Sequence, residues 1–377
     1  MLKISDILKK TKKKGEDKSS HSAKKTAARE VQEASVQANK NAEEIRKEDL
    51  VKPQDKGKSP PSISTVTAIQ FKNSDNKEAV NVYKEAISLS EQMGGLSSQN
   101  WESFYKSAKR IIDIFINILG SDENALLRLF FSDYYSSQGY LYQHSVNTCI
   151  LSLYISISIK YSREQLHQVG LAALLHDIGL IQYDNLISQN KRFGKNEYNE
   201  IRQHPIAGRK IIENISSNMD IEILEVISQE HERLDGSGYP HALKEEEISE
   251  KARLIGLVDS YESMMHIRPY RDKFKSEEVI KFLTQQKVRF EYKFIKALID
   301  LIGVFPIMTS VKLNTRETGV VIKQNFQMPL KPVVNITHSA QGQKTDTPKA
   351  IDLASNFSIY IQEGFISHKT KDEKNSE

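Results

Sequence analysis

The strongest constraint on the fold of this 377-residue chain is a run of helical patterns between about residues 76 and 305. In the first, apolar side chains recur every three or four residues from Trp101 to Ile118, which is typical of an amphipathic helix. Similar patterns cover residues 141–160, 163–175, 196–214, 219–231, 249–265, 276–285 and 290–302. Such helices bury their apolar sides against one another, so a mainly α chain with a helical bundle is predicted.

Histidines and acids interrupt these apolar sides at intervals of roughly 30 residues, about one helix plus a turn. This spacing would let each helix aim one side chain at a common centre, and imidazoles with carboxylates suit manganese, iron or zinc. Neighbouring helix positions point about 100° apart, so adjacent His176 and Asp177 reach one centre only near a helix end or a kink. Asp177 has two oxygens and is the natural bridging ligand. The candidate ligands are His144, His176, Asp177, His204, His231 and Asp259.

Each of these residues also has a purely structural interpretation. A single histidine on an apolar face is more often a hydrogen-bonded core residue than a ligand. A buried carboxylate needs a partner, because burying an unpaired charge is costly, and a metal centre would supply that partner to Asp177 and Asp259.

The segments that flank the bundle differ from it in composition. Residues 1–58 hold 16 Lys/Arg and 10 Asp/Glu, a net charge of +6 in a chain of net charge +4. Residues 1–75 have few aromatic residues and are expected to be a disordered basic arm. Its start, Leu2 to Leu8 followed by KKTKKK, predicts either a short helix in weak peripheral contact with a membrane or a solvated tail. Without interleaved aromatics, no nucleic-acid partner is expected.

The segment after Pro306 is rich in valine and isoleucine in short runs between polar breaks. The runs VKLNT, GVVIKQN, PVVNITHS and SIYIQEGF predict strands. We therefore expect an N-terminal helical region at 76–125, the main bundle at 126–305, a small β unit at 306–365 and a disordered tail at 366–377.

Cys149 is the single cysteine, which excludes an intrachain disulfide and a cysteine-based zinc site. No dinucleotide-binding GxGxxG or P-loop pattern occurs. The start has no apolar core of signal-peptide length, and the most apolar run, CILSLYISISI, is about half of the roughly 20 residues that span a bilayer. A cytoplasmic protein is expected.

The stretch HERLDGSGYP, residues 231–240, joins a candidate ligand to a stiff turn. Gly236 and Gly238 permit close backbone approach, and Pro240 restricts both itself and Tyr239. Tyr239 offers either an aromatic face for a guanine base or a structural hydrogen bond.

Two of these motifs, LLHDIG at 174–179 and HERLDGSGYP, resemble the two halves of the HD-GYP domain, a branch of the HD metal-dependent phosphohydrolases. YLYQHS at 140–145, QHPIAG at 203–208 and RLIGLVDSYESMMHIRPYR at 253–271 fall in the matching order. The resemblance covers about residues 125–305, and the β segment is similar to an appendage of many members.

The resemblance implies a cyclic di-GMP phosphodiesterase that yields pGpG, and in many members GMP, through a metal-activated hydroxide. It implies His176 and Asp177 as catalytic residues and a centre of two divalent metals, manganese or iron. The implied ligands are His144, His176, Asp177, His204, Glu230, His231 and Asp259. The implied substrate-binding residues are Arg268, Arg271, Tyr239, Gly238 and Asp235.

The sequence departs from the family pattern at four positions. Glu230 replaces the first of two histidines, and as a hard ligand it favours manganese or iron. Leu180 replaces a lysine, so one cation near the phosphate is lost. Tyr140 stands where three-metal members carry a glutamate, which favours two metals. Glu262 is the second acid of the Asp-x-x-Asp pair, a mild change.

Two rival functions stay open at this level. The first is a degenerate domain that binds cyclic di-GMP or a protein partner without turnover, as Glu230 and Leu180 suggest. The second is an HD hydrolase that acts on another nucleotide, against which the DGSGYP and RPYR motifs argue. The arginines of RPYR, Arg268 and Arg271, would grip phosphate oxygens or form a surface salt bridge. Residues 101–119 would form a homodimer face or an intramolecular one, and the N-terminal region would receive signalling partners.

Overall fold

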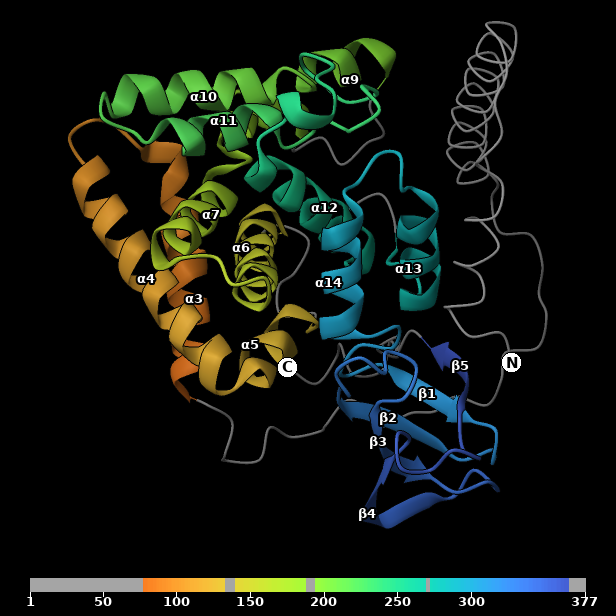
Figure 1. The fold of residues 1–377 in the computed structure, drawn as a ribbon. Coiled ribbons are helices and arrows are strands. Elements are labelled where there is room, and N and C mark those ends of the chain that lie inside the picture. Colours follow the sequence, from red (N-terminus) through yellow and green to blue (C-terminus); the bar gives the residue numbers. More distant parts are fainter. Residues whose placement is uncertain (1–76, 133–139, 188–193, 269–271, 366–377) are drawn as a thin grey trace, which may run out of the picture. The chain divides into compact units, whose positions relative to one another are not determined.

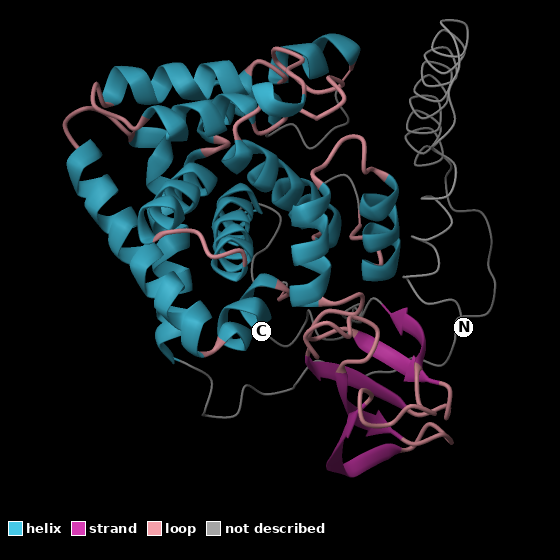
Figure 2. Ribbon diagram, viewed as in Figure 1, coloured by secondary structure: helices cyan, strands magenta, loops and turns pink. Residues whose placement is uncertain are grey.

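The computed structural model describes residues 77–132, 140–187, 194–268 and 272–365. The basic arm predicted for residues 1–75 and the tail predicted for 366–377 lie outside these residues. The described chain is mainly helical with a small antiparallel sheet at its C-terminal end, so the predicted fold class is confirmed (Figures 1 and 2). The α-helices are α3 (Lys77–Glu91), α4 (Trp101–Ser121), α5 (Glu123–Phe130), α6 (Tyr140–Ser158), α7 (Arg163–Leu175), α8 (Asp184–Ile187), α9 (Lys195–Ile201), α10 (His204–Ile215), α11 (Ile221–Gln229), α12 (Glu250–Met265), α13 (Ser276–Gln285) and α14 (Tyr292–Ile302). Short 3₁₀ turns are η1 (Gln92–Gly95), η2 (Ile178–Tyr183) and η3 (Glu245–Glu247).

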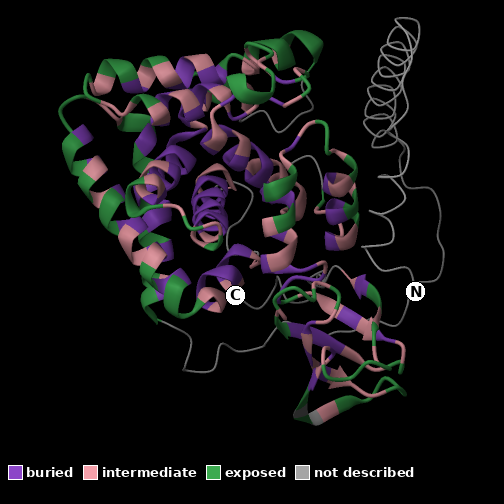
Figure 3. Cartoon of the chain, viewed as in Figure 1, coloured by how far each residue is buried: buried purple, intermediate pink, exposed green. Residues whose placement is uncertain are grey.

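Helix α6 lies at the centre of the bundle and is buried on all sides over most of its length (Figure 3). Every residue from Gln143 to Leu153 is buried. A helix without an exposed face must be surrounded, and α6 contacts α3, α5, α7, α12 and α14 among others. One hydrophobic core extends from Ala79 in α3 to Ile302 in α14. His144, near the start of α6, therefore projects from the interior of the bundle.

The predicted helix 196–214 is wrong as a single element. It is divided into α9 and α10 by a turn at Arg202 and Gln203. Pro205, in the first turn of α10, has no N–H to donate and disfavours helical geometry in the residue before it, so a new helix starts there more readily than an old one continues. The break places His204 at a helix start.

The predicted helix 219–231 also ends early. Helix α11 stops at Gln229, so Glu230 and His231 lie in the turn that follows it. Both side chains are therefore presented from a bend in the chain.

The C-terminal sheet has five described strands in the order β4-β3-β2-β1-β5, with each neighbouring pair antiparallel. The strands are β1 (Ser310–Leu313), β2 (Thr318–Lys323), β3 (Val333–His338), β4 (Lys344–Asp352) and β5 (Ile361–Phe365). Strand β4 was not predicted, because it is an edge strand of largely polar sequence, KTDTPKAID. No described helix has the length and apolar character needed to cross a bilayer.

Candidate metal centre

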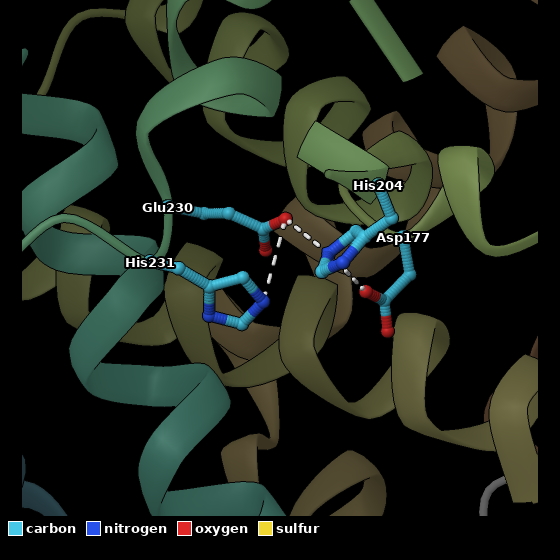
Figure 4. Close-up of side chains that lie close together, drawn as sticks. All are labelled: Asp177, His204, Glu230 and His231. Atoms are coloured by element: carbon cyan, nitrogen blue, oxygen red, sulfur yellow. Dashed lines mark hydrogen bonds and ion pairs between the residues drawn. The ribbon is translucent and has the colours of Figure 1, made fainter. Parts of the chain in front are cut away.

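The six residues that the spacing predicted to converge lie together in the structure, and Glu230, which the family resemblance added, lies with them. Asp177 is the residue common to two groups of potential ligand atoms. Its Oδ2 lies 3.4 Å from Nε2 of His176, and its Oδ1 lies 3.3 Å from Nε2 of His204. The first group is His144, His176 and Asp177, and the second is Asp177, His204, Glu230 and His231 (Figure 4).

The end of α7 brings His176 and Asp177 to the same centre. The α-helix stops at Leu175, and the chain continues into the 3₁₀ turn η2 at Ile178. The two adjacent side chains therefore approach each other at a helix end, and their sharing of one metal centre stays a prediction. Gly179 permits the arrangement, because a Cβ there would lie 1.9 Å from the carbonyl oxygen of His204. The bare backbone lets η2 lie against α10, which carries His204.

Asp259 of α12 also spans the two groups. Its Oδ1 lies 3.1 Å from Nε2 of His144, and its Oδ2 lies 3.7 Å from Nδ1 of His231. Asp177 and Asp259 therefore each direct one carboxylate oxygen toward the first group and the other oxygen toward the second. This arrangement suits two neighbouring cations.

The burial and hydrogen bonding of Glu230 indicate whether these residues suit a metal. Its side chain is fully buried, with Oε1 3.3 Å from Nε2 of His204. Its Oε2 has no hydrogen-bond partner among the described residues. It lies 3.7 Å from Nε2 of His176, and a buried carboxylate oxygen without a hydrogen bond costs roughly 1–3 kcal/mol, which a bound cation would offset. With nitrogen and oxygen donors and no sulfur, the site fits divalent manganese, iron or zinc.

The pKa values of the histidines and carboxylates in the cluster are shifted because these groups lie close together. Burial disfavours the imidazolium of His144, but the Glu262 and Asp259 carboxylates together outweigh burial and raise the pKa of His144 to about 9. Burial likewise opposes protonation of His204, yet hydrogen bonds to Asp177 and Glu230 raise its pKa to about 10. Burial alone would raise the pKa of Asp177, but His176 and His204 hold it well below its usual range. The low pKa values of Asp177 and Asp259 keep both carboxylates ionised, as a cation site requires.

The loop at 231–240 packs directly against the second group. The Tyr239 ring stacks on the His231 ring with centroids 4.6 Å apart, and the Arg202 guanidinium lies 4.6 Å from the Tyr239 ring centre. A Cβ on Gly238 would lie 2.4 Å from Cα of Glu232, so only glycine fits there without movement. The exposed Asp235 accepts a hydrogen bond from the N–H of Ser237 (2.9 Å). Gly238 and Asp235 thus shape the loop, and their contact with substrate stays a prediction.

Comparison with known proteins shows which family has a similar sequence. Residues 98–293 match the HD domain family, and residues 310–372 match a KOW domain associated with the HD domain. The chain is 29% identical over 219 residues to a protein of Pseudomonas aeruginosa named cyclic di-GMP phosphodiesterase, covering 58% of this chain and 53% of the relative. It is 28% identical over 201 residues to one of Borreliella burgdorferi with the same activity in its name, covering 53% and 52%.

The family match spans just over half of the chain. This chain belongs to the HD domain family. The resemblance to HD-GYP proteins is confirmed by the same matches, although the chain spans about half the length of the curated relatives. A solved HD-GYP-type protein, Bd1817 from Bdellovibrio bacteriovorus, shares the fold, with a TM-score of 0.50, 18% identity and coverage of 61% of this chain and 74% of that one.

Arg268 of the HD domain contacts one candidate ligand directly, with its NH2 group 3.2 Å from Nδ1 of His144. Its side chain is 7% exposed, and its NH2 group lies 3.1 Å from Oε2 of Glu262. Its guanidinium also lies 5.1 Å from the ring centre of Tyr140, the residue that replaces a family glutamate. The phosphate contact expected of Arg268 stays a prediction, and that of Arg271 lies outside the described residues.

Three residues of the HD domain support the ligands without having been singled out for this. Glu262 is buried and its Oε2 accepts a short hydrogen bond from Nδ1 of His144. His266 contacts the backbone oxygens of Glu262 (3.0 Å) and Phe130 (2.6 Å). Arg202 lies over Tyr239. For Glu262 a signal existed in the sequence, since it follows Asp259 by three residues and so shares its helix face. For Arg202 and His266 the sequence held no such signal.

Proposed function

We propose that this chain is a phosphodiesterase that hydrolyses cyclic di-GMP to pGpG at a centre of two divalent metals. The proposal rests on two carboxylates, those of Asp177 and Asp259. Each directs one oxygen toward the first group of ligands and the other oxygen toward the second group. The names of the relatives support the substrate class.

The residues that would hold the metals divide between the two groups. His144 and His176 would serve one ion, while His204, Glu230 and His231 would serve the other. Asp177 and Asp259 would belong to both. Bound there, divalent metals supply Lewis acidity to phosphoryl oxygens and lower the pKa of a water molecule.

The chain's own groups would bind and orient the dinucleotide beside the ligands. Arg202 is half-buried and has no carboxylate partner among the described residues, so its guanidinium is available to a phosphate. It would replace the cation that the family places at Leu180. Tyr239 is fixed between its stacking contact with His231 and the guanidinium of Arg202, so it would form a rigid side of the substrate site.

The decisive experiment supplies purified, metal-free protein with manganese or ferrous iron and follows cyclic di-GMP by chromatography. We expect pGpG to appear, and we expect Asp177→Ala to abolish turnover. Nucleotide binding without turnover under either metal would contradict the enzyme. A Glu230→His variant shows whether the departure from the family pattern changes the metal preference.

A parallel arm with 3′3′-cGAMP tests the substrate. Some relatives from Vibrio cholerae, 26% and 27% identical to the matched parts of this chain, are named 3′3′-cGAMP-specific phosphodiesterases. We expect cyclic di-GMP to be hydrolysed with the higher kcat/KM, and the reverse order would reassign the substrate.

A further inference from the structure

A buried chain of polar side chains connects helix α3 to the metal ligands. It runs from Tyr83 in α3 through Asn147 in α6 to Glu262 in α12 and ends at His144. Tyr83 and Asn147 are fully buried, and Glu262 is 2% exposed. Most buried polar groups form hydrogen bonds, and the side chains of Tyr83, Asn147 and Glu262 form theirs with one another. Helices α3 and α12 both contact α6, which carries the middle of the chain (Figure 1).

The direction of donation along this chain is determined by chemistry. The Glu262 carboxylate only accepts, so the Asn147 atom 3.1 Å from its Oε1 must be the amide nitrogen. The other amide atom of Asn147 is then its oxygen, which accepts from the Tyr83 hydroxyl at 2.9 Å. The Gln143 amide donates to the same hydroxyl oxygen at 3.2 Å. The Tyr83 proton is therefore directed at Asn147.

The far end of the chain determines how His144 faces the centre. Asn147 donates to Oε1 of Glu262, which also lies 3.1 Å from Nδ1 of His266, and this leaves Oε2 against Nδ1 of His144. Because the carboxylate only accepts, Nδ1 is the donor at this contact, and the Arg268 NH2 group, 3.2 Å from Nδ1, donates to Oε2 of Glu262 instead. In the neutral imidazole, Nε2 then keeps its lone pair, and Nε2 is the atom that lies 3.1 Å from Asp259 and 3.6 Å from Asp177.

We propose that Tyr83 is a positioning residue for the metal centre. It acts through Asn147 and Glu262 to keep Nε2 of His144 free for a cation. Tyr83 lies before residues 98–293, the range matched by the HD domain family, so an element outside that range completes the site. This inference rests on the metal centre of the proposed function and adds the residue that orients one of its ligands.

The test measures manganese affinity in the full chain by isothermal titration. Tyr83→Phe keeps the buried ring and removes only the hydroxyl. We expect it to weaken manganese binding on the order of tenfold, as losing an outer partner of a ligating histidine does. Asn147→Ala interrupts the same chain one step further on. We expect the double variant to bind no worse than Asn147→Ala alone, because both changes break one path.

A matched control separates this effect from lost packing. Ser90, also buried on α3, donates to the carbonyl of Ala86 and has no place in the chain of hydrogen bonds. Ser90→Ala should leave manganese affinity unchanged, while thermal unfolding without metal reports the stability of every variant.

Nitrogen NMR of labelled histidine in the zinc-loaded protein gives a second readout. Wild type should show His144 protonated on Nδ1, and this proton should exchange faster with solvent in Tyr83→Phe. Equal manganese affinities, or equal losses in Ser90→Ala and Tyr83→Phe, would overturn the inference alone. A wild-type chain that binds no manganese would overturn both the inference and the proposed function.

Discussion

Glu230 is the residue at which this site differs most in chemistry from the HD-GYP pattern. A histidine there would offer one neutral nitrogen, whereas the carboxylate adds a negative charge and a second donor atom. Its Oε1 already contacts His204, and its Oε2 is buried without a hydrogen-bond partner among the described residues. An acid in this setting favours a hard cation.

We predict that Glu230→Gln weakens manganese binding by more than the roughly 10–100-fold typical of losing an outer partner of a ligand. The amide keeps the size of the side chain but removes the charge. Isothermal titration of the metal-free protein measures the change. Glu225→Gln, at a half-buried position on the same helix, is the control and should bind manganese like wild type.

Gly238 gives a second prediction for a single residue. Its Cβ would lie 2.4 Å from Cα of Glu232 and 2.5 Å from the nitrogen of Arg233, so Gly238→Ala must displace the loop. We expect a loss of about 1–3 kcal/mol in the free energy of unfolding, as for other overpacked sites, together with weaker substrate binding.

Denaturant unfolding and KM measure these two effects of Gly238→Ala. Gly120→Ala is the matched control, because a Cβ at Gly120 meets nothing within 4 Å. Being in helix α4, it should be neutral or slightly stabilising. Equal behaviour of the two variants would show that the loop is not tightly packed.

Most of the candidate ligands lie at the beginning or the end of a helix. His176, His204 and Glu230 lie at the end of α7, the start of α10 and the end of α11. At a helix end the chain turns, so neighbouring residues reach directions that a continuous helix separates. This is why the end of α7 presents two ligands together.

The protonation states of His144 in α6 and His204 in α10 predict how metal binding depends on pH. In the metal-free protein His144 and His204 are protonated at pH 7, since their pKa values are raised to about 9 and about 10. A metal binds only the neutral imidazole, so binding must release protons, and affinity should rise as pH increases from 6.5 toward 8.5, by up to about tenfold per pH unit for each proton released.

Calorimetry in buffers of different ionisation enthalpy counts the protons released on binding. Asp177→Ala, which lacks the shared carboxylate, should release fewer. An affinity that stays flat across this pH range would contradict the assigned ligands.

The elements themselves were predictable wherever periodicity was strong. Helix α13 was predicted with its observed bounds, and α7 likewise. The break between α9 and α10 was missed because the apolar pattern continues across it, although Pro205 gave a local signal. Strand β4 was missed because an edge strand with few buried residues has little apolar pattern.

At the scale of the whole molecule, the ligands come from α6, α7, α10, α12 and the turn after α11. A metal that binds them holds these segments together only in the folded chain, so it should stabilise the native state. We predict that manganese at a hundredfold excess over Kd raises the free energy of unfolding by about 2.7 kcal/mol. Thermal unfolding with and without manganese measures this, and an equal shift in Asp177→Ala would contradict it.

The sequence by itself determined the mainly α class and the identity of the candidate ligands, since periodicity and residue type are local properties. Only the tertiary structure decided which oxygen of Asp177 and Asp259 faces which group, because side-chain directions depend on how helices pack. It also decided that Arg268 contacts both His144 and Glu262. The chain from Tyr83 to His144 joins residues up to 179 positions apart, from 83 to 262, and no local pattern records such contacts.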